Sequence, residues 1–240
     1  MINMKKNGFT LVEIIIGMAI GAVIMLAVYA SMNMAQKSSA SVGRKVATQQ
    51  DARAVLDLMA TEIRMASYNP TGQVKASTIP TGSCSSIGWP SPLVPANKGI
   101  LVADPYRILI AMDLTVDSGG NPVIPASIGD SASEDIEYSY VGGTTKTIFR
   151  NIGGVAGCSG DTAILGGAGS ATMVGNGTAT PVFQYFDNTD AVTTSIPAIR
   201  RIRITIVAET ENKDSLTNQV KTMTYTTDVL VKNHVLSHIW

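Results

Sequence analysis

The sequence has no excess of charge of either sign. It contains 18 lysines and arginines and 18 aspartates and glutamates, so the formal net charge at neutral pH is zero. Proteins that bind nucleic acid or an anionic membrane surface electrostatically present an excess of basic side chains. Neither partner is therefore expected. The one local basic cluster, Arg200, Arg201 and Arg203, is interleaved with isoleucines, which favours the solvated face of a strand over a phosphate-binding patch.

Patterns that carry catalysis are also missing. No histidine precedes residue 234, so a Ser/His pair has no support from neighbouring sequence. Residues 157–161 (GCSGD) depart from the GxSxG pattern of a nucleophilic serine, and no GxxxxGK[ST] phosphate loop occurs. We therefore predict no catalytic residue and no cofactor, and we expect a structural protein rather than an enzyme.

Metal ligands are equally few. His234 and His238 would share one face of a helix, but two ligands do not make a zinc site, and we interpret them as terminal surface histidines. Asp113, Asp117 and Asn121 form a loose acidic group whose spacing fits no calcium loop, so a solvated turn is the preferred interpretation. No metal site is predicted.

Long apolar runs are limited to one, residues 9–30, which contains a single charged side chain, Glu13. At about 1.5 Å per residue its 22 residues span roughly 33 Å, which matches a hydrocarbon core of about 30 Å. The chain is therefore expected to cross a membrane once. Lys5 and Lys6 precede the run and the next basic residue is Lys37, so the start of the chain stays cytoplasmic and the remainder reaches the periplasm of a bacterium.

The small residue that could mark a cleavage site lies before the apolar run rather than after it. A secretory signal peptide carries its small-residue cleavage site after the apolar core, whereas Gly8 comes before it. Cleavage after Gly8 would leave a free amine on Phe9, one helical turn from Glu13. A charge inside a spanning helix costs about 2.5 to 3.5 kcal/mol, so an acid at this position is expected to have a partner.

Residues 5–13 (KKNGFTLVE) resemble the processing site of type IV prepilins and type II secretion pseudopilins. The resemblance implies cleavage between Gly8 and Phe9 by a prepilin peptidase and N-methylation of Phe9. It also implies that Glu13 pairs with the N-terminal amine of a neighbouring subunit during assembly. Many major pilins carry a proline at the position of Ala30, and its absence favours a straighter helix and a minor subunit. The alternative is an uncleaved signal anchor with Glu13 near the membrane interface.

The two cysteines, Cys84 and Cys158, fit the oxidising compartment that this topology predicts. An even count favours a single disulfide, which would stabilise the fold by about 2 to 4 kcal/mol. Two independent buried thiols are the alternative.

A second helical pattern follows the apolar run. Apolar residues recur at steps of three and four, and we expect charged residues to occupy the other faces. The apolar set is Ala52, Val55, Met59, Ile63 and Ala66, and the charged set is Asp51, Arg53, Asp57, Glu62 and Arg64. We predict one helix from Phe9 to Ala66 that thins or bends within residues 31–45. Its end, residues 63–68, resembles PilW-like minor pilins and J-type type II secretion pseudopilins.

After residue 99 the apolar residues recur at every second position instead of every three or four positions, which predicts strands. The candidates are residues 100–103, 106–114, 136–141, 145–150, 182–186, 199–208 and 222–231. Gly142 and Gly143 predict a tight hairpin. Residues 153–177 are rich in glycine and are expected to form a long surface loop, which together with residues 77–97 would face partners.

The predicted architecture is α+β, a long N-terminal helix packed on an antiparallel sheet, and is type IV pilin-like. It divides into a leader (1–8), a transmembrane and assembly helix (9–30), the amphipathic half of the helix (31–67) and a periplasmic β-rich domain (68–240). The expected function is that of a minor pilin, with a type II secretion pseudopilin or a membrane-anchored adhesin as alternatives. Expected partners are other pilins or pseudopilins, the prepilin peptidase and methyltransferase, and the inner-membrane assembly platform.

Overall fold

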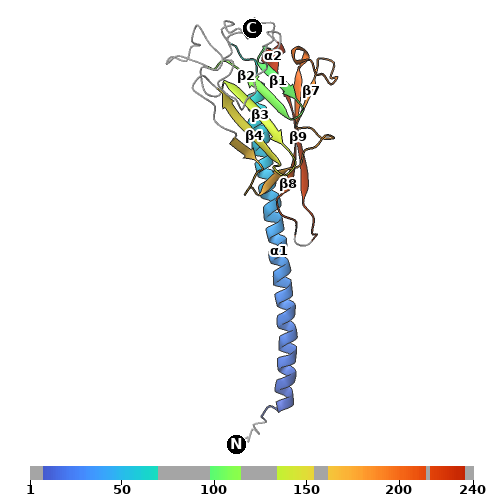
Figure 1. Cartoon of the computed structure of the whole chain (residues 1–240). Coiled ribbons are helices and arrows are strands. Elements are labelled where there is room, and N and C mark those ends of the chain that lie inside the picture. The colour runs from blue at the N-terminus through green and yellow to red at the C-terminus, as the bar shows by residue number, and fades with distance from the viewer. Residues whose placement is uncertain (1–7, 70–97, 115–133, 154–161, 215–216, 236–240) are drawn as a thin grey trace, which may run out of the picture.

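The structure, a computed structural model, describes residues 8–69, 98–114, 134–153, 162–214 and 217–235. A single long helix, α1 (Leu11–Arg64), forms a stalk whose distal part enters a β-rich head (Figure 1). Its 54 residues span roughly 81 Å. Its bounds lie within two residues of the predicted ones, and the predicted α+β architecture is confirmed.

The helix continues without interruption through residues 31–45, where we expected it to thin or bend. Serine weakens helices by offering alternative hydrogen bonds, but a hydroxyl can also bond back to the preceding turn. Ser31 does so, because its Oγ donates to the carbonyl of Ala27 at 2.9 Å. The polar composition of this segment is therefore compatible with a regular helix.

Five strands form the first sheet in chain order. They are β1 (Ile100–Asp104), β2 (Arg107–Ala111), β3 (Asp135–Val141), β4 (Thr147–Gly153) and β5 (Thr162–Leu165), each antiparallel to its neighbour. The hairpin predicted at Gly142 and Gly143 joins β3 to β4, but its connection runs from residue 142 to 146 and is longer than a tight turn. Gly143 and Lys146 adopt left-handed conformations there, with φ of 69° and 46°.

Four strands form the second sheet around a central strand. They are β6 (Thr172–Val174), β7 (Phe183–Phe186), β8 (Arg201–Thr210) and β9 (Thr222–Leu230). β9 pairs with one edge of β8, while β7 and β6 pair with the two ends of its other edge. The alternation predicted for β8 is confirmed, because Ile202, Ile204 and Ile206 are buried and the residues between them are not.

The prediction of a long surface loop at residues 153–177 was wrong for two segments, because β5 and β6 lie within this range. Each strand is too short to show a clear alternation. β5 pairs with the preceding strand β4, whereas β6 pairs with the end of β8, which is distant in sequence. Cys158 lies in this segment, and Cys84 lies before β1, but both fall outside the described residues. The disulfide stays a prediction.

One hydrophobic core joins the helix to both sheets. The distal half of α1 contacts β8 and β9 as well as β5 and β6. Its buried apolar residues are those of the predicted stripe, together with Leu56 and Ala60. Burying a large aliphatic side chain contributes about 1.5 to 3 kcal/mol, so this stripe accounts for the attachment of the helix to the head.

Glu62 was expected on a face of α1 other than the apolar one, but it is buried, with only 9% of it exposed. Its carboxylate accepts a hydrogen bond from Arg150 Nη2 at 2.6 Å and another from the hydroxyl of Tyr138. The sequence contained a signal for this burial, since Glu62 is three residues after Met59 and four before Ala66, within the apolar stripe. The partners come from β3 and β4 and could not be paired with it from local pattern.

His234 was expected at the surface and is 2% exposed. It belongs to a short helix, α2 (Lys232–Val235), beside a 3₁₀ turn, η3 (Ile196–Ala198). Its Nδ1 lies 3.0 Å from the hydroxyl of Ser67, and its Nε2 lies 2.9 Å from the carbonyl of Ile196. These contacts attach the end of the described chain to the turn that ends α1. His238 lies outside the described residues.

Candidate functional site

Gly8, Phe9 and Thr10 precede α1 and are exposed, with Phe9 at 85%. The backbone of Gly8 is not left-handed, and a Cβ added there would meet no atom within 4 Å. The fold therefore does not require glycine at this position. Any requirement for a small residue must come from a partner that handles this end of the chain.

Glu13 and Thr10 form a capping box at the start of α1. The Glu13 carboxylate accepts from the backbone N–H of Thr10 at 2.9 Å and from its hydroxyl at 3.0 Å, both through Oε2. In return, the N–H of Glu13 donates to Thr10 Oγ1 at 3.3 Å. Such a box satisfies two N–H groups at the helix start, and the helix dipole favours a carboxylate there. Glu13 is thus hydrogen-bonded to the peptide group between Phe9 and Thr10, one residue after the peptide bond between Gly8 and Phe9.

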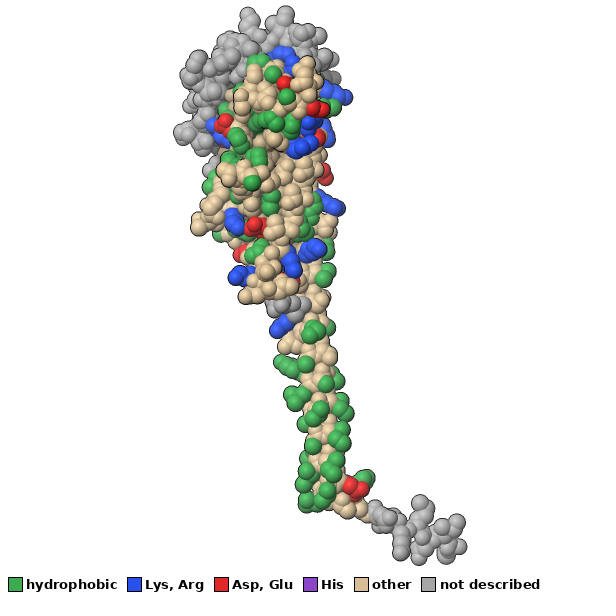
Figure 2. All heavy atoms as spheres, turned by 90° about the vertical axis from the view of Figure 1, so that its right-hand side faces the viewer, with side chains coloured by type: hydrophobic (Ala, Val, Ile, Leu, Met, Phe, Trp, Pro, Cys, Tyr) green, Lys and Arg blue, Asp and Glu red, His purple; other side chains and the backbone are tan. Residues whose placement is uncertain are grey.

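The stalk beyond Glu13 is apolar on the face that Figure 2 shows. Residues 14–36 contain no acidic or basic side chain and extend over roughly 34 Å, enough to cross a bilayer. Every residue from 14 to 32 is exposed, and α1 is the one described helix apolar and long enough to span a membrane. An apolar surface of this size needs a membrane or other helices to cover it.

Gly17 and Gly21 lie in this part of the stalk at a spacing of four. A Cβ added at either position would meet nothing within 4 Å, so neither glycine is required by packing within the chain. Small residues at this spacing allow close approach of a second helix in lipid. Ordinary tolerance of glycine in membrane helices is the alternative explanation.

The ion pair between Glu62 and Arg150 couples the stalk to the first sheet. Hydrogen bonding to Glu62 raises the pKa of Arg150, and burial together with the Glu62 carboxylate raises the pKa of Tyr138 well above its usual value. Both groups therefore keep their protons throughout the physiological range. Removing one member of a buried pair costs about 3 to 5 kcal/mol, so this contact stabilises the position of the head on the helix.

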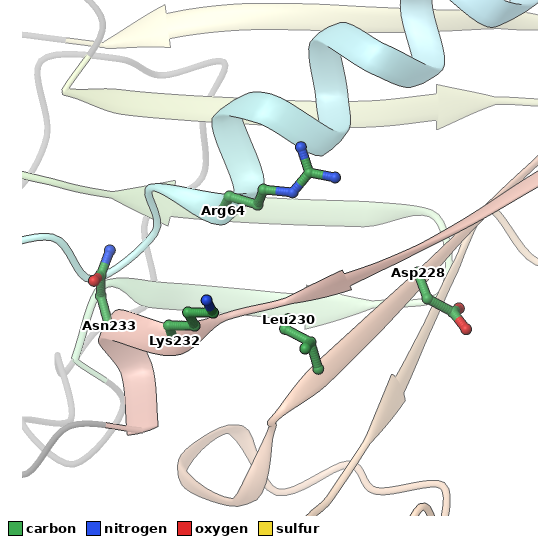
Figure 3. A pocket seen from close by; sticks show the side chains of 5 residues that line it. All are labelled: Arg64, Asp228, Leu230, Lys232 and Asn233. Carbon is green, nitrogen blue, oxygen red and sulfur yellow. The ribbon is translucent and has the colours of Figure 1, made fainter.

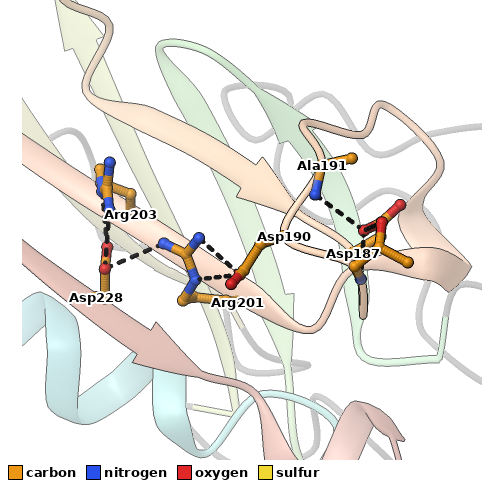
Figure 4. A network of polar contacts seen from close by, with 7 residues as sticks. Asp187, Asp190, Ala191, Arg201, Arg203 and Asp228 are labelled. Carbon is orange, nitrogen blue, oxygen red and sulfur yellow. Dashed lines mark hydrogen bonds and ion pairs between the residues drawn. The ribbon is translucent and has the colours of Figure 1, made fainter.

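The basic cluster on β8 is neutralised within the head (Figure 4). Arg201 lies 3.9 Å from the ring centroid of Phe186 and donates to Asp190 and Asp228 at 2.9 and 3.0 Å. Arg203 donates to Asp228 at 2.8 Å, and these hydrogen bonds lower the pKa of that carboxyl. Arg200 instead bonds the carbonyls of η3 and the residue after it. Arg201 and Arg203 are therefore paired with acids, whereas Arg200 is bonded to backbone carbonyls.

The loose acidic group is not assembled within the described residues. Asp113 is buried rather than solvated, and its N–H donates to the carbonyl of Tyr68. Asp117 and Asn121 lie outside the described residues. Across the ranges that the structure describes, no three His, Cys, Asp or Glu side chains gather to hold a metal ion.

A family model described as the prokaryotic N-terminal methylation motif matches residues 3–29. Neither the curated proteins nor the solved structures give a match. The chain thus carries the prepilin-type N-terminal motif, and its long apolar helix fits a type IV pilin-like protein. The motif implies processing by a prepilin peptidase and assembly with other pilins, and the apolar helix fits membrane anchoring. The match ends within α1 and does not extend to the head.

Proposed function

We propose that this protein is a minor pilin, a structural subunit of a type IV pilus that is cleaved between Gly8 and Phe9 and N-methylated at Phe9. The observation that carries the proposal is the placement of Glu13, the one charged side chain in the apolar, exposed segment of residues 9–32, one turn from the expected cut. A carboxylate there is unfavourable in lipid unless a cation joins it. Cleavage creates that cation on an adjacent copy or relative.

Before assembly, the subunit is held in the bacterial inner membrane by its single spanning helix. Residues 1–8 face the cytoplasm and the β-rich head faces the periplasm. On assembly, the apolar stalks pack together, and each Glu13 neutralises the Phe9 amine of a neighbour in a medium of low dielectric constant. Because desolvation of both charges offsets much of their attraction, the pair fixes the register of the helices more than it adds stability.

One feature favours a minor pilin over a major pilin: α1 passes Ala30 without a break, where many major pilins carry a proline. A type II secretion pseudopilin shares the same subunit plan and is the second candidate, supported by the resemblance at the end of α1. A passive membrane anchor for an adhesin is the third.

Mass spectrometry of the N-terminal peptide tests the proposal. We expect N-methylated Phe9 as the first residue of the mature chain. Gly8→Ala should block processing while leaving the head folded, because the added methyl group meets no atom of the protein. A chain that keeps residues 1–8 in cells with an active prepilin peptidase would overturn the proposal and leave a tethered periplasmic domain.

Glu13→Gln separates the charge of Glu13 from its capping role. The glutamine carbonyl can still accept from the Thr10 N–H, so the helix start is retained while the charge is lost. We expect this variant to be processed normally and to enter filaments poorly. Thr10→Ala weakens the cap and keeps the charge, which makes it the matched control. Normal incorporation of Glu13→Gln would contradict the proposed pairing.

A further inference from the structure

A surface cavity of about 400 Å³ opens where the end of α1 meets the end of β9 and the start of α2 (Figure 3). Five residues line it: Arg64, Asp228, Leu230, Lys232 and Asn233. Arg64 comes from α1, and the other four come from the consecutive elements β9 and α2, more than 160 residues later in the chain. The cavity exists only because the folded head brings the end of the stalk beside the last strand.

The cations of this cavity are not neutralised by the head. Arg64 and Lys232 are exposed, and neither forms an ion pair with any residue that the structure describes. The one acid in the lining, Asp228, is held by Arg201 and Arg203 at 3.0 and 2.8 Å. The cavity therefore presents two cations whose charge is uncommitted.

Leu230 adds an apolar surface between these charges. It is 57% exposed, whereas Val229 and Val231 on either side of it are fully buried. One exposed leucine by itself carries no meaning. Beside an arginine and a lysine, however, it complements a side chain that has a carboxylate on a short hydrocarbon stem. The guanidinium of Arg64 can accept a carboxylate with two parallel hydrogen bonds.

The position of the cavity along α1 excludes the headgroups of the membrane that holds the stalk. Arg64 lies 28 residues beyond Gln36, where the uncharged part of the stalk ends, which corresponds to roughly 42 Å of helix. A neighbouring protein can reach this height. Arg64 also lies on the side of α1 that the sheets leave uncovered, as do Asp57 and Thr61. A subunit that packs along the stalk would continue onto this side.

We propose that the cavity binds an aspartate or glutamate side chain of an adjacent pilin-type subunit. The inference rests on the proposed function, because assembly is what brings such a neighbour against α1. Arg64 and Lys232 hold the carboxylate, and Leu230 packs against its stem. The contact fixes the rotation of the head relative to the next subunit, which the pairing at Glu13, at the other end of the helix, cannot do.

Zero-length carbodiimide coupling in filaments that contain the full-length protein tests the contact. The reagent joins an amine directly to a carboxylate, and we expect an amide between Lys232 Nζ and an acidic residue of a protein that carries the same N-terminal motif. Lys232→Arg keeps the charge and removes the amine, so it should lose this product and still assemble. Coupling of Lys232 only to acids of its own chain, or to none, would overturn the proposal.

Reversing the charge of the two cations tests whether the contact is needed for incorporation into filaments. The double variant Arg64→Glu, Lys232→Glu changes two exposed residues and should leave the head folded, while its incorporation falls at least tenfold. Reversing the charge of the coupled acid on the neighbour should restore it. If the double variant is incorporated normally while Phe9 is methylated and Glu13→Gln assembles poorly in the same cells, the cavity proposal is wrong. The proposed function is not affected by that result. Retention of residues 1–8 would remove the proposed function and this inference together.

Discussion

Asp135 and His234 are buried groups whose folded-state pKa values move in opposite directions. Burial lowers the pKa of His234 to about 4, and the nearby charges of Lys98 and Arg200 add to the effect against the opposing hydrogen bond to Ile196. Burial raises the pKa of Asp135 to about 7, and the neighbouring carboxylate of Glu134 adds to it. Each group therefore makes the free energy of unfolding depend on pH.

The two dependences have opposite signs over the same range. Folded His234 binds fewer protons than the unfolded residue, whose pKa is 6.5, so its contribution is lost as pH falls from 6.5 to about 4. Folded Asp135 binds more protons than the unfolded residue, whose pKa is 3.8, so its contribution is lost as pH rises from 3.8 to about 7. At about 1.36 kcal/mol for each tenfold change in proton affinity, each effect amounts to roughly 3 kcal/mol between pH 4 and 6.5, and they nearly cancel.

Replacing one of the two groups at a time by an uncharged amide should show how the free energy of unfolding depends on pH through the other group. In Asp135→Asn the effect of His234 is no longer offset, so the free energy of unfolding relative to the parent should fall by about 3 kcal/mol as pH is lowered from 6.5 to 4. In His234→Gln the free energy of unfolding should instead fall by a similar amount as pH is raised across that range. The slope is compared, not the absolute stability, because each substitution also perturbs packing.

Urea unfolding of the full-length protein in non-ionic detergent, followed by far-UV circular dichroism, measures these slopes. Groups that do not interact with Asp135 or His234 titrate equally in all three proteins, so their contribution cancels when each variant is compared with the parent. Parallel pH profiles for the parent and both variants would refute the assignment of these groups as buried and oppositely perturbed. Slopes of the reverse sign would refute it as well.

Two further predictions concern stability. Glu62→Gln leaves Arg150, whose side chain is 17% exposed, without its counter-ion and should lower the free energy of unfolding by about 3 kcal/mol, whereas Asp57→Asn on the exposed side of α1 should change it by less than about 0.5 kcal/mol. Gly99→Ala would place a Cβ 2.2 Å from the carbonyl oxygen of Ala111 and should cost more than about 2 kcal/mol, while Gly177→Ala has open space. Urea midpoints distinguish each pair, and equal midpoints within a pair would contradict the corresponding contact.

Much of the fold was predictable where a pattern is long and local. The apolar run, the stripe that begins at Ala52 and the alternation of β8 each repeat over many residues, so periodicity alone identifies the element and its buried side. The N-terminal motif combines residue order with hydrophobicity. The capping box between Thr10 and Glu13 was not predicted, although their spacing is the one that such a box requires. The family match at residues 3–29 falls on these same features.

The contacts that fix the head could not be predicted in the same way. Ser67 and His234 are 167 residues apart, and Tyr138 and Glu62 are 76 apart, so no local period relates them. β5 and β6 are held by partners outside their own sequence. In each case the energy comes from burial and pairing in the assembled fold, which overrides the local preference of the segment.

The unbroken course of α1 has a mechanical consequence. In the proposed membrane-anchored state, a tilt of the apolar part of α1 would move the head with it, because the helix has no break between them. For a length of roughly 81 Å, an inclination of about 10° displaces the far end by about 14 Å sideways. The tilt of the stalk would therefore set the lateral range over which the head can meet the proposed neighbouring subunits.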